Sequence, residues 1–229
     1  MELPVVLGIA VLLGIRHALD PDHVVAVSTL VSEERRLWPA ARLGFIWGIG
    51  HLIPIALVGL PLVLLRLELP PQFEHFTDLA VGILLVALGL VTLVRVVRER
   101  VHFDVHAHED TIHGHFHRPG HHHPTVPLDR RQWITLGFGF VHGLAGSGGA
   151  AVLAMQAAPT FGVAVLWILI FGLGTTLGMF GMTLFIAAPA LAVVSRRTIA
   201  YAAVRALAGI ASLGFGGYMI WTLLPSVVA

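Results

Sequence analysis

The sequence alternates between long apolar stretches and short polar connections. A helix that crosses a lipid bilayer needs about 20 largely apolar residues. Six stretches reach that length, and they cover approximately residues 3–31, 39–65, 76–97, 132–158, 161–188 and 199–224. The pattern therefore predicts an all-α integral membrane protein with six transmembrane helices.

The first stretch is interrupted by charged residues. Residues 16–28 read RHALDPDHVVAVS, which brings arginine, aspartate and histidine into an apolar segment. Pro21 has no N–H to donate to the carbonyl group of His17, which would leave that carbonyl free. Irregular backbone is tolerated inside a membrane where it lines a cavity. We therefore predict that the first helix is broken near Pro21.

Composition supports a membrane protein and excludes several function classes. Apolar residues make up 56% of the 229 and charged residues 12%, whereas soluble domains have roughly 45–50% and about 25%. The absence of cysteine excludes disulfides, iron–sulfur clusters and thiolate metal sites. A net charge near zero argues against a nucleic-acid partner. The sequence has no G-x-x-x-x-G-K-[ST] loop, so we expect no nucleotide as a partner.

Arginine supplies all 14 basic side chains, and these residues gather on one side of the predicted membrane. Those in or beside the connections after the first, third and fifth stretches are Arg35, Arg36, Arg42, Arg95, Arg98, Arg100, Arg118, Arg130, Arg131, Arg196, Arg197 and Arg205. The opposite side holds only Arg66. Because arginine-rich connections stay in the cytosol, we predict a protein of the cytoplasmic (inner) membrane with both termini outside.

The two halves of the sequence resemble each other in three segments. The pairs are RHALDPDHVVAV (from residue 16) with VHGLAGSGGAAV (from 141), FIWGIGHLIPIALVGLPLVL (45) with ILIFGLGTTLGMFGMTLFIA (168), and AVGILLVALGL (80) with LAGIASLGFGG (207). The first pair aligns His17 with His142. We predict two three-helix repeats, residues 1–97 and 132–229, joined by a cytosolic connection, 98–131. An odd number of spans makes the second repeat inverted, as in many secondary transporters.

Ionisable side chains are concentrated in the first two predicted helices. Such a group at the bilayer centre costs at least about 2.5–3.5 kcal/mol, so it usually faces a cavity and marks a pathway. In an unbroken helix His17 and His23 would point about 240° apart around the axis, and the predicted break could bring them together. Imidazole and carboxylate groups suit nickel, cobalt, zinc or iron. The predicted metal ligands are His17, Asp22, His23 and His51.

Further residues are predicted to support these ligands or to line the pathway. They are Arg16, Asp20, His142, Ser147 and Thr175. Asp20 could cap the helix after the break or orient a histidine. The glycine-rich segment that begins at His142 favours close helix packing, with Ser147 hydrogen-bonding across helices. An alternative for the whole cluster is a structural hydrogen-bond network in which Arg16 pairs with a carboxylate.

Several motifs follow one another along the chain. The segment from His17 to His23 fits H-x4-D-H, and WGIGH, HGLAGSGGA and FGLGTTLGM come after it in that order. In these motifs the chain resembles the nickel/cobalt transporter family, and in particular the six-span branch that includes urease-accessory nickel permeases. The resemblance implies that His17, Asp22, His23 and His51 select Ni²⁺ or Co²⁺.

Nine histidines lie between Val101 and Pro124 in the long connection. Neutral imidazole is a good ligand for nickel, copper, cobalt and zinc. The residues predicted to capture metal in the cytosol are His106, His108, His113, His115, His117, His121, His122 and His123. A segment of such low complexity need not fold, and a tolerated polar linker is the alternative.

These observations predict a secondary permease, not an enzyme, that moves Ni²⁺, with Co²⁺ second, into the cell without a permanent cofactor. Its expected partners are the metal ion, membrane lipid and, as a candidate, a cytosolic nickel chaperone. The alternatives are an efflux protein of the same plan and a metal sensor or assembly subunit that transports nothing. A di-iron oxidase fits poorly because clustered histidine boxes are missing, and a serine protease fits poorly because no histidine follows His142.

Overall fold

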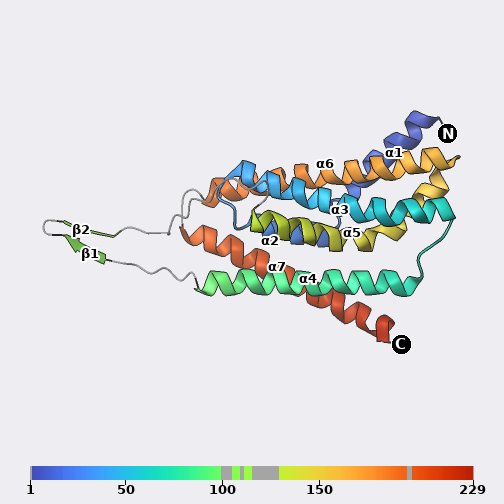
Figure 1. Ribbon diagram of the computed structural model, residues 1–229. Helices are drawn as coiled ribbons and strands as arrows, with labels where there is room; N and C mark the ends of the chain where they lie inside the picture. The colour runs from blue at the N-terminus through green and yellow to red at the C-terminus, as the bar shows by residue number, and fades with distance from the viewer. Residues whose placement is uncertain (1, 99–104, 109–110, 115–128, 195–197, 229) are drawn as a thin grey trace.

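The helices α1 to α7 run roughly lengthwise through the computed structural model, which describes residues 2–98, 105–108, 111–114, 129–194 and 198–228 (Figure 1). Their bounds are α1 Leu3–His17, α2 Pro21–Val31, α3 Leu37–Leu65, α4 Pro71–Arg98, α5 Arg130–Ala157, α6 Phe161–Val194 and α7 Thr198–Val228. Both termini lie at one end of the bundle, here called the terminal end. The other end, where α2 and α4 end and α3 and α5 begin, is called the arginine end.

The first predicted span consists of two helices joined at a sharp bend. α1 and α2 meet at 58° across residues 18–20. Pro21 is the first residue of α2, a position that suits proline because an N–H there would lack a helical partner anyway. The prediction of a break near Pro21 is confirmed. The prediction that the carbonyl of His17 is left free was wrong, because it accepts a 3.0 Å hydrogen bond from the N–H of Asp20.

By length and composition, the helices α3 to α7 can each cross a membrane, and the bent pair of α1 and α2 makes a sixth span if the pair counts as one. Large apolar side chains such as Leu57, Phe185 and Trp221 are exposed on the surface of the bundle. Such exposure is expected where lipid rather than water surrounds the helices. The prediction of a helical integral membrane protein is therefore confirmed, with five spans, or six where the bent pair counts as one.

The long helices pack in pairs that cross between the two halves of the sequence. α3 packs against both α5 and α6, α1 packs against α6, and α4 packs against α7. Gly50, Gly139 and Gly143 lie where α3 meets α5, and a Cβ atom at any of them would collide with a backbone oxygen of the facing helix. This close approach, which only glycine permits, places His51 of α3 directly beside α5.

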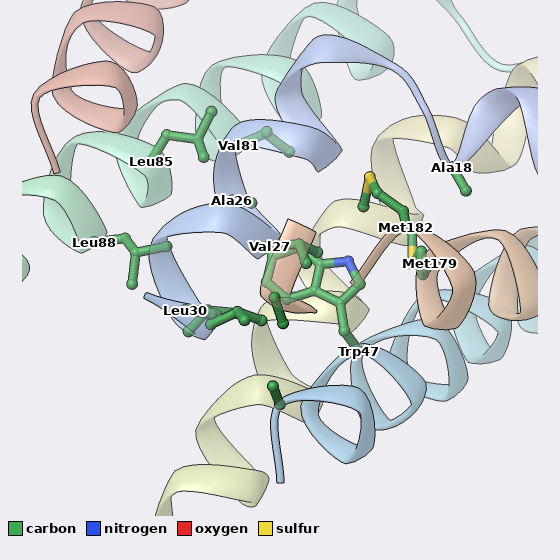
Figure 2. Close-up of a cluster of buried hydrophobic side chains, with 13 residues drawn as sticks. Ala18, Ala26, Val27, Leu30, Trp47, Val81, Leu85, Leu88, Met179 and Met182 are labelled. Carbon is green, nitrogen blue, oxygen red and sulfur yellow. The ribbon is translucent and has the colours of Figure 1, made fainter. Parts of the chain in front are cut away.

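α2 lies inside the bundle and is held there by apolar contacts (Figure 2). Its Val27 and Leu30 belong to a buried cluster that includes Trp47 of α3, Leu85 of α4 and Met179 of α6. With 11 residues, α2 is only about 16 Å long, too short to cross a membrane alone. Packing against several helices therefore fixes where its first turn lies.

Charged residues fix the arginine end of α2. Glu33, just after α2, lies 2.7 Å from Arg95 of α4, 3.5 Å from Arg131 of α5 and 3.6 Å from Arg205 of α7. Glu34 pairs with Arg131 as well. These five residues, called the ion-pair cluster below, join the end of α2 to three other helices.

The connection between α4 and α5 contains two short strands, β1 (Val105–His108) and β2 (Thr111–Gly114). They pair antiparallel, with His106 opposite His113 and His108 opposite Thr111. A segment that need not fold by its composition thus includes regular secondary structure. The remaining histidines predicted to capture metal lie outside the described residues; they are His115, His117, His121, His122 and His123.

Candidate metal site

Residues from four helices meet at the break between α1 and α2. His17 is the last residue of α1, Asp22 and His23 are in the first turn of α2, His51 is in α3 and His142 is in α5. His23 lies centrally, with ring centroids 4.8 Å from His17, 5.0 Å from His51 and 4.3 Å from His142. The 58° bend is what brings His17 and His23 together, because a continuous helix would direct them to diverging faces.

These side chains form two groups, each compact enough for one metal ion. The three-histidine group consists of His17, His23 and His51, and the aspartate group consists of Asp22, His23 and His142. Within each group, one ligand atom per residue lies within 4.8 Å of the others. The four predicted ligands therefore do not form a single set, since Asp22 is in a different group from His17 and His51.

Asp20 holds the ring of His17 in place. The Nδ1–H of His17 donates a 2.8 Å hydrogen bond to Asp20 Oδ2, so that Nε2 of His17 points to Nε2 of His51 at 3.2 Å. Asp20 is the residue before α2, but its side chain makes no capping hydrogen bond. Of its two predicted roles, the contact to a histidine is the one present in the structure. A carboxylate bound to one imidazole nitrogen fixes the orientation and raises the basicity of the other.

Several ring nitrogens in the site have no protein partner. His23, His51 and His142 are at most 1% exposed. In the described part of the chain, Nε2 of His23, Nδ1 of His51 and Nδ1 of His142 accept or donate no hydrogen bond. A buried polar atom without a partner costs about 1–3 kcal/mol. Buried nitrogen lone pairs beside a carboxylate are a suitable donor set for nickel, cobalt or zinc.

A cavity of about 270 Å³ reaches the three-histidine group from the terminal end. Its walls include Arg16 and Asp20 beside the break, and Glu74 and Asp78 from the beginning of α4. His17 also lines it, and the His17 side chain is 22% exposed, whereas the other histidines are buried. Three carboxylates against one guanidinium give the cavity a negative potential that attracts cations.

The remaining predicted residues are placed as follows. Arg16 lines the cavity, and His142 joins the aspartate group. Ser147 and Thr175 are buried, but each hydroxyl donates to a carbonyl of its own helix, at 2.8 Å and 3.0 Å. The cross-helix hydrogen bond predicted for Ser147 is therefore not formed. The reason is local, because a helical hydroxyl readily reaches the carbonyl one turn back.

The carboxylates of Glu74 and Asp78 in the cavity were not predicted from the sequence, and His142 was predicted only to support the ligands or to line the pathway. Glu74 and Asp78 are four residues apart at the start of an apolar helix, so they share one helical face, and that spacing could have revealed them. For His142 the signal was its alignment with His17 in the internal repeat.

Comparisons with known proteins show the family of this chain. The chain matches the family NicO, described as high-affinity nickel-transport protein, over residues 4–216. It is 32% identical over 191 residues to the urease accessory protein UreH of Bacillus sp. (strain TB-90). The aligned residues cover 82% of this chain and 79% of that protein. No solved structure matches it. The chain therefore belongs to the NicO family of high-affinity nickel-transport proteins, which are transporters and not enzymes.

Proposed function

We propose that this protein is a secondary permease that carries Ni²⁺ into the cell across the cytoplasmic membrane, with Co²⁺ as a competing substrate. The observation that carries the proposal is the three-histidine group at the inner end of an acidic cavity. Three imidazoles can replace part of the hydration shell of a divalent transition metal, whereas Mg²⁺ and Ca²⁺ prefer oxygen ligands. The site therefore discriminates against the two commonest divalent ions.

The ion follows a path set by these side chains. The carboxylates of Asp20, Glu74 and Asp78 concentrate cations in the cavity. The ion then loses water to Nε2 of His17, which Asp20 has already oriented, and to the buried rings of His51 and His23. Because Asp20 fixes the ring before metal arrives, little conformational freedom is lost on binding.

The direction of access follows from the distribution of arginine. The positive-inside rule places the arginine end in the cytosol, so the cavity opens outward. On the cytosolic side the ion-pair cluster joins α2 to α4, α5 and α7. In this proposal the acidic cavity is the outward entry. Release to the cytosol passes the ion-pair cluster, which lines a second cavity of about 440 Å³ at the arginine end.

The membrane potential is a sufficient driving force for uptake. Each elementary charge that crosses 100 mV gains about 2.3 kcal/mol, so a dication gains about 4.6 kcal/mol. Outward transport would need another driver of at least that size. Uptake is therefore the direction that requires no coupled ion.

Helix packing supports the proposal of two inverted repeats, residues 1–97 and 132–229. The proposed repeats relate α1 with α2 to α5, α3 to α6, and α4 to α7. Exchanging each helix for its counterpart converts the α1–α6 pair into the α5–α3 pair and leaves the α3–α6 and α4–α7 pairs unchanged. These four pairs make the main contacts of the bundle. A two-fold relation between the halves predicts this set.

The histidine-rich connection, on the proposed cytosolic side, receives the ion. The antiparallel pairing of β1 and β2 puts the backbone of His106 opposite that of His113. Weak capture there would pass Ni²⁺ to a cytosolic nickel chaperone.

Proteoliposomes that contain a nickel-quenched dye test the function. Under an inside-negative potential, external Ni²⁺ should quench the dye, and His17→Ala, His23→Ala and His51→Ala should each abolish the signal. His75→Ala is the matched control, because His75 lies near the start of α4 and belongs to neither metal group. Flux that occurs only with an imposed pH gradient and runs outward would instead support efflux. Binding without any flux would support a sensor.

A further inference from the structure

We infer that the transported ion occupies a second position, held by Asp22, His23 and His142, and that it reaches this position from the three-histidine group by exchange at His23. The inference rests on the proposed function, because it concerns the step that follows entry. It makes His142 a metal ligand supplied by the second half of the chain.

The donor atoms of the aspartate group have the spacing that one metal ion requires. Asp22 Oδ1 lies 3.1 Å from Nδ1 of His23, and Asp22 Oδ2 lies 2.7 Å from Nε2 of His142. Two neighbouring ligands on an octahedral ion with bonds of about 2.1 Å are about 3.0 Å apart. The hydrogen bonds that now join these atoms therefore keep the ligands close to the geometry that a metal would impose.

The second position includes a ligand that lies nearer the arginine end than the cavity wall beside His17. Gly146 of α5 lines the cavity, and a Cβ atom added there would be 3.1 Å from Nε2 of His17. His142 is four residues before Gly146, which is about 6 Å along the helix toward the arginine end. The His142 ring is 1% exposed, whereas the Asp22 side chain is 24% exposed. Movement from the three-histidine group to the aspartate group is thus movement toward the cytosolic side.

His23 connects the two positions and allows only one to be filled at a time. A neutral imidazole has one N–H and one free lone pair, so His23 can complete one group or the other. Its Nδ1 is engaged with Asp22 while its Nε2 has no partner, so the lone pair is available to the three-histidine group. The chain should therefore hold one ion in this region.

The internal alignment gives independent support. His142 occupies the position in the second half that corresponds to His17 in the first. In the structure each of the two histidines flanks His23, with ring centroids 4.8 Å and 4.3 Å away. Each half thus contributes one histidine beside the shared ligand. A merely structural His142 would serve only as the hydrogen-bond donor to Asp22.

His142→Gln separates these roles, because the glutamine amide can donate to Asp22 from the place of Nε2 but is a poor nickel ligand. In proteoliposomes we expect the maximal rate of Ni²⁺ transport to fall by about 100-fold. The half-saturating Ni²⁺ concentration should change by less than about threefold, because the first position is intact. His75→Gln is the control.

Ni²⁺ binding to the full-length, detergent-solubilised protein gives a second measurement. Histidines of the connection add the same background to every variant, so differences are compared at saturating Ni²⁺. His142→Gln and His51→Ala should each bind as many ions as the unaltered chain, because one position remains, whereas the double variant should bind one fewer.

Each contrary result has a defined meaning. If His142→Gln transports at the unaltered rate, or loses binding together with transport, there is no separate second position. If His51→Ala alone loses one ion, the region holds a single site. In all three cases the proposed function stands as long as His17→Ala and His23→Ala stop transport; if those variants transport normally, the function itself fails.

Discussion

Gly146→Ala tests the link between the cavity and the metal site with a single added methyl group. Gly146 lines the cavity on α5, and the new Cβ atom would lie 3.1 Å from Nε2 and 3.5 Å from Cε1 of His17. Ordinary contacts between nonbonded heavy atoms are about 3.5–4.0 Å. The methyl group would therefore occupy space beside the nitrogen proposed to bind metal, and the ring must retreat by roughly half an ångström.

Two effects of this substitution oppose each other. Alanine in a helix interior is favoured over glycine by about 1 kcal/mol, so α5 should be at least as stable as before. At the site, displacement of His17 weakens one metal ligand. Loss of ligand orientation typically costs 10–100-fold in metal affinity, or about 1.4–2.7 kcal/mol. The local steric effect should therefore dominate transport even though the fold is retained.

The assay is the dependence of Ni²⁺ flux on Ni²⁺ concentration in proteoliposomes. Gly146→Ala should raise the half-saturating concentration by about 10–100-fold. Gly137→Ala is the matched control, because Gly137 is exposed on the same helix and its added Cβ meets nothing within 4 Å. Equal half-saturating concentrations in the two variants would refute the placement of His17 at the entry to the site.

Three further predictions follow from the same geometry. Asp20→Ala removes the partner of His17 Nδ1 and should weaken Ni²⁺ binding by about 10–100-fold, measured by calorimetry on the purified protein. Glu74→Gln with Asp78→Asn should raise the half-saturating Ni²⁺ concentration at low ionic strength, and the difference should shrink as salt screens the cavity; a difference that is independent of salt would contradict an electrostatic role. Gly139→Ala directs a methyl group at the backbone of α3 and should lower the free energy of unfolding by about 1–3 kcal/mol. In detergent, its unfolding temperature should be lower than that of a variant in which an exposed glycine of the same helix is replaced by alanine.

The six spans could be predicted from the sequence because lipid imposes a simple requirement. A stretch of about 20 apolar residues is needed to cross it, and that length is read directly. The break near Pro21 was predictable for the same reason, because proline and charge disturb an otherwise uniform stretch. The local sequence pattern does not reveal which hydrogen bonds form at the bend. The hydrogen bond from the N–H of Asp20 to the carbonyl of His17 is one of these.

The division of the site into two groups could not be predicted from the sequence. Asp22 and His23 are neighbours in the chain. Asp22 belongs only to the group with His142, whereas His23 belongs to both groups, and this difference follows from the orientation of the first turn of α2. That orientation depends on the packing of α2 among four helices. The cavity position of Glu74 likewise depends on how α4 lies against α5, which hydrophobic periodicity does not specify.

The crossed pairing of the helices restricts how a cargo-driven motion can proceed. Glycine residues let α1 pack closely on α6 and α3 pack closely on α5, so these helices of the first half have close contacts with helices of the second half. α2 is different, because it shares its contacts among α3, α4, α6 and α7 and is not tied to one glycine-lined partner. A motion of α2 would therefore disturb fewer close helix contacts than a motion of the long helices, and it would have to break the salt bridges of Glu33.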